Sequence, residues 1–293
     1  MKNETEEPET VEFKSFFKTV KSGEGDRCHY PTRLDTFGKG CHHDCDYCYA
    51  KSLLDFRKMW DPEHPAVADI KKIRRLIANK LKPGDVVRMG GMTDCFQPAE
   101  VQEEVTFKTI EALNQKEVHY LIVTKSDLIA TKKYLNIIDM DLAHIQISVS
   151  SIYDKVAARI EKAVPPSRRI KAVEVLQDHG FDVALRVSPL VPHDDYFNEV
   201  IADTIKRTRI QKILVEFLRM NHWIEKWFPE VDQSLFTVKT GGYKHLPLET
   251  KLAYLEMLEC DKVVSVCEDV PEHYEHFKEF YNPNPEDCCN LDL

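Results

Sequence analysis

Residues 118–149 contain the repeating pattern that decides the fold. They begin with the apolar run Val118-His119-Tyr120-Leu121-Ile122-Val123, continue through an amphipathic stretch at 127–138, and end with Ile145-Gln146-Ile147-Ser148-Val149. Short apolar runs predict buried strands, and apolar residues three or four apart predict a helix. A helix of this length lets the chain cross over the sheet, so we expect the two strands to lie parallel.

The same unit recurs on both sides of this stretch. Further strands are expected at 86–89, 183–187 and 213–217. Helical periodicity fills the intervals 67–81, 99–115, 152–162, 167–179, 196–207 and 248–258. At least five such units in a row indicate an α/β fold, either a full or partial TIM-type barrel or a doubly wound sheet. In either architecture we expect the chemistry at the carboxyl ends of the strands.

The charge distribution divides the chain into a body and two tails. Residues 1–12 carry five glutamates against one lysine, and residues 268–293 carry eight acidic residues against one lysine. The net charge of -9 therefore leaves the body at 13–267 slightly basic, which neither requires nor excludes a nucleic-acid partner. We expect a disordered first tail, one domain at 13–267, and a cysteine-containing second tail that folds over the barrel mouth. The irregular segment 219–247 is expected to be an insertion or lid.

Composition indicates a globular protein outside the membrane. The 293 residues are 43% hydrophobic and 30% charged, and no run approaches the ~18 apolar residues of a membrane span. The acidic amino terminus does not resemble a signal peptide, so we expect a cytoplasmic protein with no membrane partner. In a reducing compartment, nine cysteines indicate metal binding, catalysis or packing rather than disulfides.

The most informative motif is a cysteine loop. It reads Gly40-Cys41-His42-His43-Asp44-Cys45-Asp46-Tyr47-Cys48-Tyr49. Thiols at Cys41, Cys45 and Cys48 can converge on one metal centre, because thiolates hold both iron–sulfur clusters and zinc. Structural zinc needs a fourth ligand, such as His42, His43 or Cys28, whereas a three-thiolate iron cluster leaves one iron open. Plain packing is the third interpretation.

The order of several short motifs resembles the spore photoproduct lyase-like branch of the radical S-adenosylmethionine superfamily. The motifs follow the cysteine loop in sequence: Thr93-Asp94-Cys95-Phe96-Gln97-Pro98-Ala99-Glu100, Val123-Thr124-Lys125-Ser126, Ile147-Ser148-Val149-Ser150, Pro166-Ser167-Arg168-Arg169, and Arg186-Val187-Ser188-Pro189-Leu190-Val191-Pro192. With a first strand ahead of the loop, the resemblance implies a partial TIM-type (β/α)6 barrel and an irregular C-terminal extension.

The resemblance implies a [4Fe-4S] cluster on Cys41, Cys45 and Cys48, with S-adenosylmethionine chelating the open iron. One electron, supplied by a partner such as a flavodoxin or ferredoxin, then yields a 5′-deoxyadenosyl radical. The cofactor carries this chemistry, and the protein orients the radical and excludes water.

Other residues gain expected roles from their places on the strands. Gly90 and Gly91 end the second strand, where they allow backbone to approach the cofactor amine or form a tight turn. Lys125 is a candidate cation for the cofactor carboxylate, although it can also snorkel. Further candidates for cofactor binding or catalysis are the serines of the fourth strand, a buried arginine and two loop tyrosines. These are Ser148, Ser150, Arg186, Tyr47 and Tyr49. Ser148 and Ser150 share a strand face, and Arg186 needs the cofactor or Glu216 as its partner.

Two departures from the family bear on the reaction. Cys95 stands where the family has proline, and we expect this thiol either to donate hydrogen at the barrel mouth or to pack. Met92 stands where photoproduct-cleaving members carry their hydrogen-donating cysteine, which puts photoproduct repair itself in doubt.

Three functions follow as hypotheses. The first is a radical enzyme acting on a nucleobase in DNA or a nucleotide, either by thymine-type lesion repair or by base modification. The basic runs that can contact phosphates are Lys71-Lys72, Arg74-Arg75, Arg168-Arg169-Lys171 and Lys206-Arg207-Arg209. The second is a radical enzyme for a peptide or small metabolite, and the third is a zinc-stabilised binding module. A second metal site is also conceivable, with its thiols at Cys260, Cys267, Cys288 and Cys289.

Overall fold

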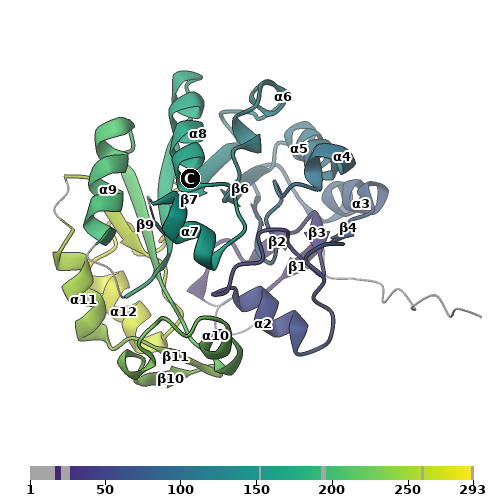
Figure 1. Ribbon diagram of the computed structural model, residues 1–293. Coiled ribbons are helices and arrows are strands. Elements are labelled where there is room, and N and C mark those ends of the chain that lie inside the picture. The colour runs from purple at the N-terminus through teal and green to yellow at the C-terminus, as the bar shows by residue number, and fades with distance from the viewer. Residues whose placement is uncertain (1–16, 21–26, 152, 193–195, 259–260, 292–293) are drawn as a thin grey trace, which may run out of the picture.

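A computed structural model describes residues 17–20, 27–151, 153–192, 196–258 and 261–291. Its centre is a curved sheet with the strand order β1-β2-β5-β6-β7-β8-β9-β12 (Figure 1). The parallel strands are β2 (Thr32–Leu34), β5 (Val86–Met89), β6 (His119–Thr124), β7 (Ala143–Ser148), β8 (Val183–Leu190), β9 (Lys212–Phe217) and β12 (Val263–Val266). β1 (Phe17–Thr19) pairs antiparallel with β2. β1 and β12 are the two edges, so the barrel is partial, which confirms the expected fold class.

The strands form where short apolar runs are buried on both faces. Val87, Ile122 and Ile147 point into one continuous core, and each is fully buried. Such burial on both faces is typical of a parallel sheet covered by helices. It also explains why the expected strands differ from those observed by only a few residues.

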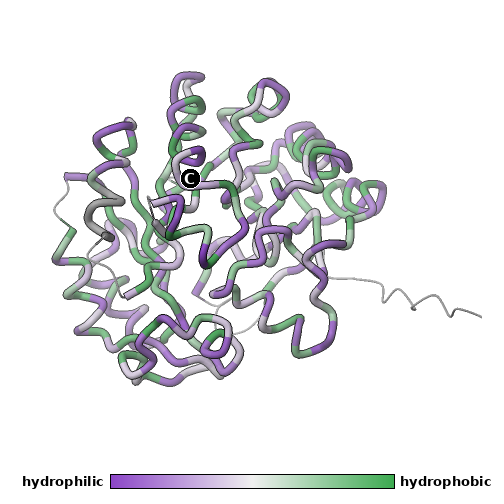
Figure 2. Tube along the Cα trace, in the orientation of Figure 1, coloured by the Kyte–Doolittle hydropathy of each residue, from purple (hydrophilic) through white to green (hydrophobic). Residues whose placement is uncertain are grey.

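Helices cover the outer face of the sheet (Figure 1). They are α3 (Ile70–Lys80), α4 (Glu100–Glu103), α5 (Val105–Gln115), α6 (Lys132–Leu135), α7 (Asp154–Ile160), α8 (Pro166–Asp178) and α9 (Tyr196–Arg207). The sequence of α3 explains its position: Asp69 caps the first N–H groups of the helix, and Ile73 and Ile77 form the face that is buried against the core. Figure 2 shows hydrophilic and hydrophobic residues alternating along these helices, as one buried face and one exposed face require.

Two of the expected helices differ from those observed. The stretch expected as one helix at 99–115 divides at Glu104, whose φ is 52°. The Glu100 carboxylate accepts the N–H groups of Thr106 and Phe107 at 2.9 Å each, which starts α5 afresh. The helix expected at 127–138 is a 3₁₀ turn at Leu128–Ala130 followed by the short α6.

The C-terminal region is more regular than expected. The segment 219–247 contains α10 (His222–Trp227) and the hairpin of β10 (Val238–Thr240) and β11 (Tyr243–His245). α11 (Leu248–Glu256) and α12 (Pro271–Phe280) flank β12, which extends the parallel sheet beyond the expected six strands.

The last described residues lie at the amino-terminal end of the barrel, not over its mouth as expected. Lys212, the first residue of β9, donates to the Asn290 carbonyl at 3.1 Å, and Gln146 of β7 donates to the Cys289 carbonyl at 3.3 Å. Leu291 packs beside Leu121 in a small apolar cluster. The tail therefore closes the end of the barrel opposite the carboxyl ends of the strands.

Candidate active site

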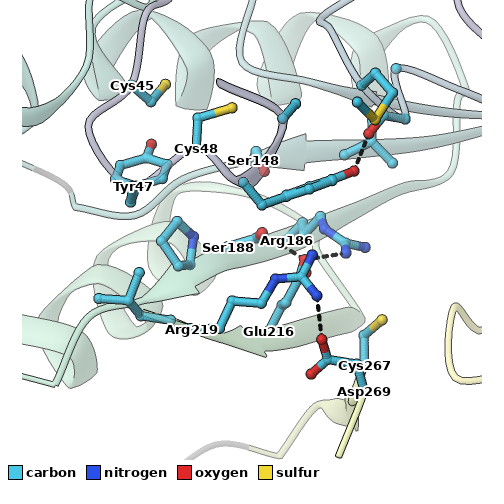
Figure 3. Close-up of a pocket in the computed structure, with 18 of the residues that line it drawn as sticks. Cys45, Tyr47, Cys48, Ser148, Arg186, Ser188, Glu216, Arg219, Cys267 and Asp269 are labelled. Carbon is cyan, nitrogen blue, oxygen red and sulfur yellow. Dashed lines mark hydrogen bonds and ion pairs between the residues drawn. The ribbon is translucent and has the colours of Figure 1, made fainter. Parts of the chain in front are cut away.

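A cavity opens at the carboxyl ends of the parallel strands, beside the cysteine loop (Figure 3). The side chains around it come from the loop at 41–49, from the end of each strand between β5 and β9, and from the segment after β12. The site candidates that line it are Cys41, Cys45, Tyr47, Cys48, Tyr49, Gly90, Gly91, Lys125, Ser148 and Arg186. The fold thus brings together residues spread over about half of the chain.

The three loop thiols face this cavity without forming a compact single-ion site. The Cys45 thiol donates to the His43 carbonyl at 3.6 Å, and the Cys48 sulfur accepts the Lys51 N–H at the start of α2 (Tyr49–Asp55). Burial raises the pKa of the Cys41 thiol to about 12. Among described residues, the thiols are not gathered within 4.8 Å of one another, whereas tetrahedral zinc places its sulfur ligands about 3.8 Å apart. A preformed zinc site is therefore not observed at the loop in the described residues.

Ion pairs and hydrogen bonds of two aspartates hold the loop in place. Asp44 accepts hydrogen bonds from the ammonium groups of Lys51 and Lys162, each at 2.9 Å. On the other side, His43 Nδ1 lies 3.4 Å from the Asp94 carboxylate, which also accepts the Lys125 backbone N–H at 2.7 Å. Asp94 therefore ties the thiol loop to the carboxyl end of β6.

The glycine pair is required by close backbone packing. Gly90 has a φ of 80°, and a Cβ there would lie 2.6 Å from the Val123 carbonyl oxygen of β6. A Cβ on Gly91 would meet the Arg33 side chain at 2.7 Å. The Gly91 carbonyl accepts the Tyr49 hydroxyl, so both glycines and the tyrosine border the cavity. The tight-turn role is thus observed, while contact with a cofactor stays a prediction.

Lys125 projects into the cavity without a carboxylate partner among the described residues. Its ammonium donates to the Ser188 carbonyl at 2.9 Å and lies 5.7 Å from the centre of the Tyr47 ring. Tyr47 is itself anchored, because its hydroxyl donates to Glu161, which also pairs with buried Arg169. The Lys125 ammonium is thus held in place without forming an ion pair with the described residues.

Arg186 has the protein partner that its burial requires. Its guanidinium donates to Glu216 at 2.5 Å and to Gln146 at 2.8 Å. Burial opposes ionisation of Glu216, but Arg186, Arg219 and Arg88 together hold its pKa down at about 2. Of the two partners expected for Arg186, Glu216 is the one observed.

Two candidates lie away from the cavity. Cys95 is fully buried in the hydrophobic core beside Phe96, so the expectation that it lies at the barrel mouth is corrected. Its chain segment turns inward because the Cys95 carbonyl accepts the buried Thr106 hydroxyl at 2.6 Å. Ser150 does not line the cavity with Ser148, since β7 ends at Ser148 and strand alternation stops there.

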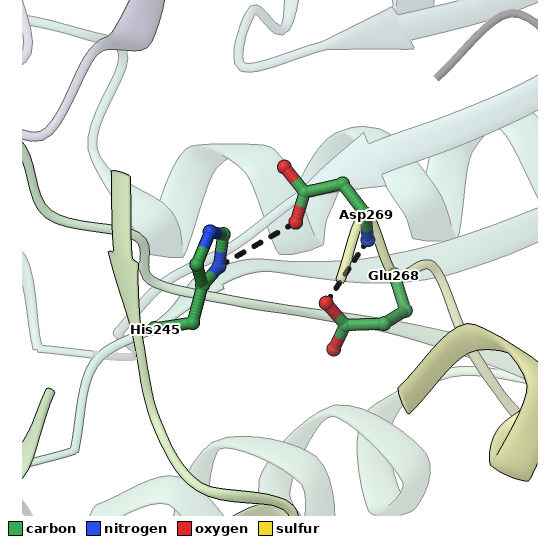
Figure 4. Close-up of side chains that lie close together, drawn as sticks. All are labelled: His245, Glu268 and Asp269. Carbon is green, nitrogen blue, oxygen red and sulfur yellow. Dashed lines mark hydrogen bonds and ion pairs between the residues drawn. The ribbon is translucent and has the colours of Figure 1, made fainter. Parts of the chain in front are cut away.

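A polar network that the sequence analysis missed forms the opposite wall (Figure 4). His245 Nδ1 lies 3.5 Å from Asp269, which also pairs with Arg219, and Glu268 pairs with buried Lys251. The Arg219 guanidinium lies between two rings, 4.6 Å from Tyr49 and 4.9 Å from Tyr243. Although His245, Glu268 and Asp269 gather closely enough for a metal ion, the adjacent cations already neutralise both carboxylates.

The cysteines considered for a second metal also border the cavity, except Cys260, which lies outside the described residues. Cys267 follows β12, Cys288 and Cys289 come from the tail, and Cys28 precedes β2. No three of these thiols lie within 4.8 Å of one another in the described part of the chain. A preformed second site is therefore not observed there.

No helix in the described ranges combines the length and the apolar character needed to cross a membrane.

Comparisons with known proteins agree with this architecture. A family model described as "Radical SAM superfamily" matches residues 36–206. The uncharacterized protein ORF301 of Acidianus two-tailed virus is 26% identical over 178 residues, which cover 57% of this chain and 58% of that protein. The match thus spans little more than half of the relative's length.

Two kinds of solved structure share the fold. Spore photoproduct lyase complexed with dinucleoside spore photoproduct is 15% identical, with a TM-score of 0.66 over 89% of this chain and 76% of that one. Streptococcus suis SuiB bound to S-adenosylmethionine is 14% identical, with a TM-score of 0.51 over 86% of this chain and 56% of that one. The resemblance found from the sequence motifs is confirmed, and at these identities the likeness is one of fold.

Proposed function

The chain belongs to the radical SAM superfamily, and from this premise we propose that it is an enzyme that generates a 5′-deoxyadenosyl radical to modify or repair a thymine-type nucleobase. The observation that carries the proposal is the meeting of three loop thiols with Lys125 and Ser148 around one cavity. The thiol spacing fits a [4Fe-4S] cluster on Cys41, Cys45 and Cys48. When bound, the reduced cluster and S-adenosylmethionine supply the radical.

The protein's own residues would bind and orient the cofactor. Lys125 has no carboxylate partner among the described residues, so its ammonium is available to the carboxylate of S-adenosylmethionine. The Ser148 side chain borders the same space, where it can bond the ribose or carboxylate. Tyr49 packs beside the glycine turn and keeps water from the reacting atoms.

The nucleobase assignment is supported by two independent features. The fold is similar to a lyase whose solved complex holds a dinucleoside photoproduct. The cavity also carries an excess of arginine and lysine, which suits a nucleotide better than a neutral metabolite. Met92 replaces the family's hydrogen-donating cysteine, so we favour base modification or rearrangement over photoproduct cleavage as the reaction. Electrons would come from a flavodoxin or ferredoxin.

Anaerobic reconstitution tests this proposal. Iron and sulfide should bind in equal amounts with a broad brown absorbance, and the reduced protein should release 5′-deoxyadenosine from S-adenosylmethionine. Mass spectrometry of reactions with thymidine, thymidine monophosphate and thymine-containing DNA should then reveal a changed base. A colourless zinc protein, or products from peptides alone, would contradict it.

A matched variant tests the thiol assignment. Cys45→Ala should lose the cluster, because two thiolates cannot hold the cube and leave one iron open for the cofactor. Cys28→Ala is the control, since that thiol borders the same cavity but lies outside the loop. Full iron and sulfide content in Cys45→Ala would contradict the assignment of Cys45 as a cluster ligand.

A further inference from the structure

Arg88 is a half-buried cation in the barrel interior whose side chain forms no hydrogen bond or close ion pair with the described residues. It lies on β5, borders the cavity, and has a buried Nε without a hydrogen-bond acceptor. No ion pair or hydrogen bond joins its guanidinium to any side chain or carbonyl in the described ranges. A guanidinium carries five N–H donors, and leaving the buried Nε–H without an acceptor is costly.

The other buried arginines show that this arrangement is unusual in this protein. Arg169 donates to Glu161, to the Ser148 carbonyl and to the Val164 carbonyl. Arg186 donates to Glu216 and Gln146. The Glu216 carboxylate also attracts Arg88, but the side chains that donate hydrogen bonds to it among the described residues are those of Arg186 and Ser188. Arg88 lacks such partners in the described part of the chain, so its guanidinium has donors to offer a ligand.

We propose that Arg88 binds the phosphate of a free nucleotide substrate in the barrel interior, below the glycine turn. This inference rests on the proposed function and narrows its substrate class. Arginine matches a phosphate with parallel hydrogen bonds, and the local charges leave room for one anion. Around it, the three guanidinium groups of Arg88, Arg186 and Arg219 outnumber the two carboxylates of Glu216 and Asp269.

The position of Arg88 favours a free nucleotide over a base within DNA. It lines the cavity together with Cys28 and Cys289, which places it near the tail that closes the amino-terminal end of the barrel. Neither sulfur lies within hydrogen-bond distance of it. Residues 288–291 are anchored across this end of the barrel, so we expect them to block a polynucleotide that extends beyond the phosphate.

The surface charges do not offer a substitute for this site. Arg168 pairs with Asp127 at 2.5 Å, Arg209 with Asp178 at 2.9 Å, and Lys171 with Glu174 at 2.7 Å. These three residues belong to basic runs that were expected to contact phosphate, and acidic residues of the same surface already partner them. Arg88 differs from them because it lies inside the barrel and its Nε is buried without an acceptor.

Binding measurements on the reconstituted full-length protein test the site. Inorganic phosphate, at constant ionic strength set with chloride, should raise the melting temperature of the wild type. Arg88→Gln should weaken phosphate binding by about 10- to 100-fold, as expected for a lost charge-assisted contact. Arg88→Lys should recover part of it, and Arg159→Gln, on an exposed helix surface, should bind like the wild type. Equal phosphate binding by the wild type and Arg88→Gln would overturn the proposal.

Binding measurements with nucleotides identify the ligand of this site. Thymidine monophosphate should bind about 10-fold or more tightly than thymidine to the wild type, and this preference should vanish in Arg88→Gln. A single-stranded thymidine oligonucleotide should not compete. Preference for the oligonucleotide, or equal binding of thymidine and its monophosphate, would overturn the assignment. Because these readouts need no cleavage of S-adenosylmethionine, they stand apart from failure of the radical reaction.

Folding of the variant does not limit the test. Removing a buried charge that lacks a partner should leave the melting temperature without phosphate unchanged or raise it, since no native ion pair is lost. A large fall in melting temperature for Arg88→Gln without ligand would reveal a structural partner and contradict the inference.

Discussion

At the scale of single residues, Cys45 and Cys95 show how similar thiols come to differ in function. Both are buried, and burial raises the pKa of each. Cys45 nevertheless lies on the cavity wall within a loop held by Asp44 and Asp94. Cys95 lies in the core, where its sulfur packs among apolar side chains and is out of reach of a cavity ligand.

Replacing Cys95 should affect stability and leave the cluster intact. Cys95→Ala removes one buried sulfur atom, so we expect the free energy of unfolding to fall by about 1–2 kcal/mol. Iron and sulfide content and the yield of 5′-deoxyadenosine should match the wild type, as measured by denaturant titration and product analysis. Altered product formation in a stably folded Cys95→Ala protein would contradict this prediction and show that the thiol takes part in the reaction.

At the scale of elements, the sequence predicts best where burial alone determines the structure. The strands at 119–124 and 143–148 follow from apolar runs that need cover on both faces. The break at Glu104 does not, because it depends on a carboxylate that bonds two N–H groups several residues further along. β12 was not expected either, although its four apolar-rich residues make it as long as the expected β5.

The same reasoning applies to the candidate site. A motif made of consecutive residues, such as the cysteine loop, is visible in one stretch of sequence. Arg88, Arg219 and His245 meet in the cavity only because separate strands converge there, and each stands in an ordinary local pattern. Ser150 was wrongly grouped with Ser148 because the end of β7 has no clear signal in the sequence.

The end of β5 should depend on glycine for packing as well as for conformation. Gly90→Ala places a Cβ against the Val123 carbonyl oxygen in a left-handed conformation, which should cost about 2–4 kcal/mol of unfolding free energy. Gly84→Ala is the matched control, because its φ is 82° but nothing lies within 4 Å of the new atom. It should cost only about 1 kcal/mol. Equal losses would show that close packing at β6 is unimportant.

Neighbouring strands β6 and β7 carry a pair of histidines that should make the fold sensitive to acid. Burial, and then the nearby His119, lower the pKa of His144 to about 4. Between pH 6.5 and 4, His144 therefore binds a proton in the unfolded chain but not in the folded chain. The free energy of unfolding falls as the pH falls through this range. Urea titrations at pH 7.5, 6 and 5 should show this slope, and His144→Gln should flatten it. An unchanged slope would assign the effect to other groups.

At the scale of the whole molecule, the partial barrel is closed differently at its two ends. The cysteine loop and the polar wall at Arg219 and Asp269 border the carboxyl ends of the strands. The tail covers the amino ends through contacts of single residues, such as Ser265 with the Cys288 carbonyl and Lys212 with the Asn290 carbonyl. Composition identified the tail as a distinct segment, but isolated hydrogen bonds of this kind leave no pattern that predicts which end it covers.

Removing the tail should therefore weaken the fold and spare the thiol loop. A chain ending at Asn282 loses the burial of Cys289 and Leu291 and the hydrogen bonds that Asp287 accepts from their N–H groups. We expect a loss of about 3–5 kcal/mol in unfolding free energy and binding of an apolar dye at the exposed strands. Leu291→Ala should reproduce about 2–3 kcal/mol of it. Iron and sulfide should still bind, because Cys41, Cys45 and Cys48 lie at the opposite end. Unchanged stability with lost iron would mean that the tail supports the cluster rather than the barrel.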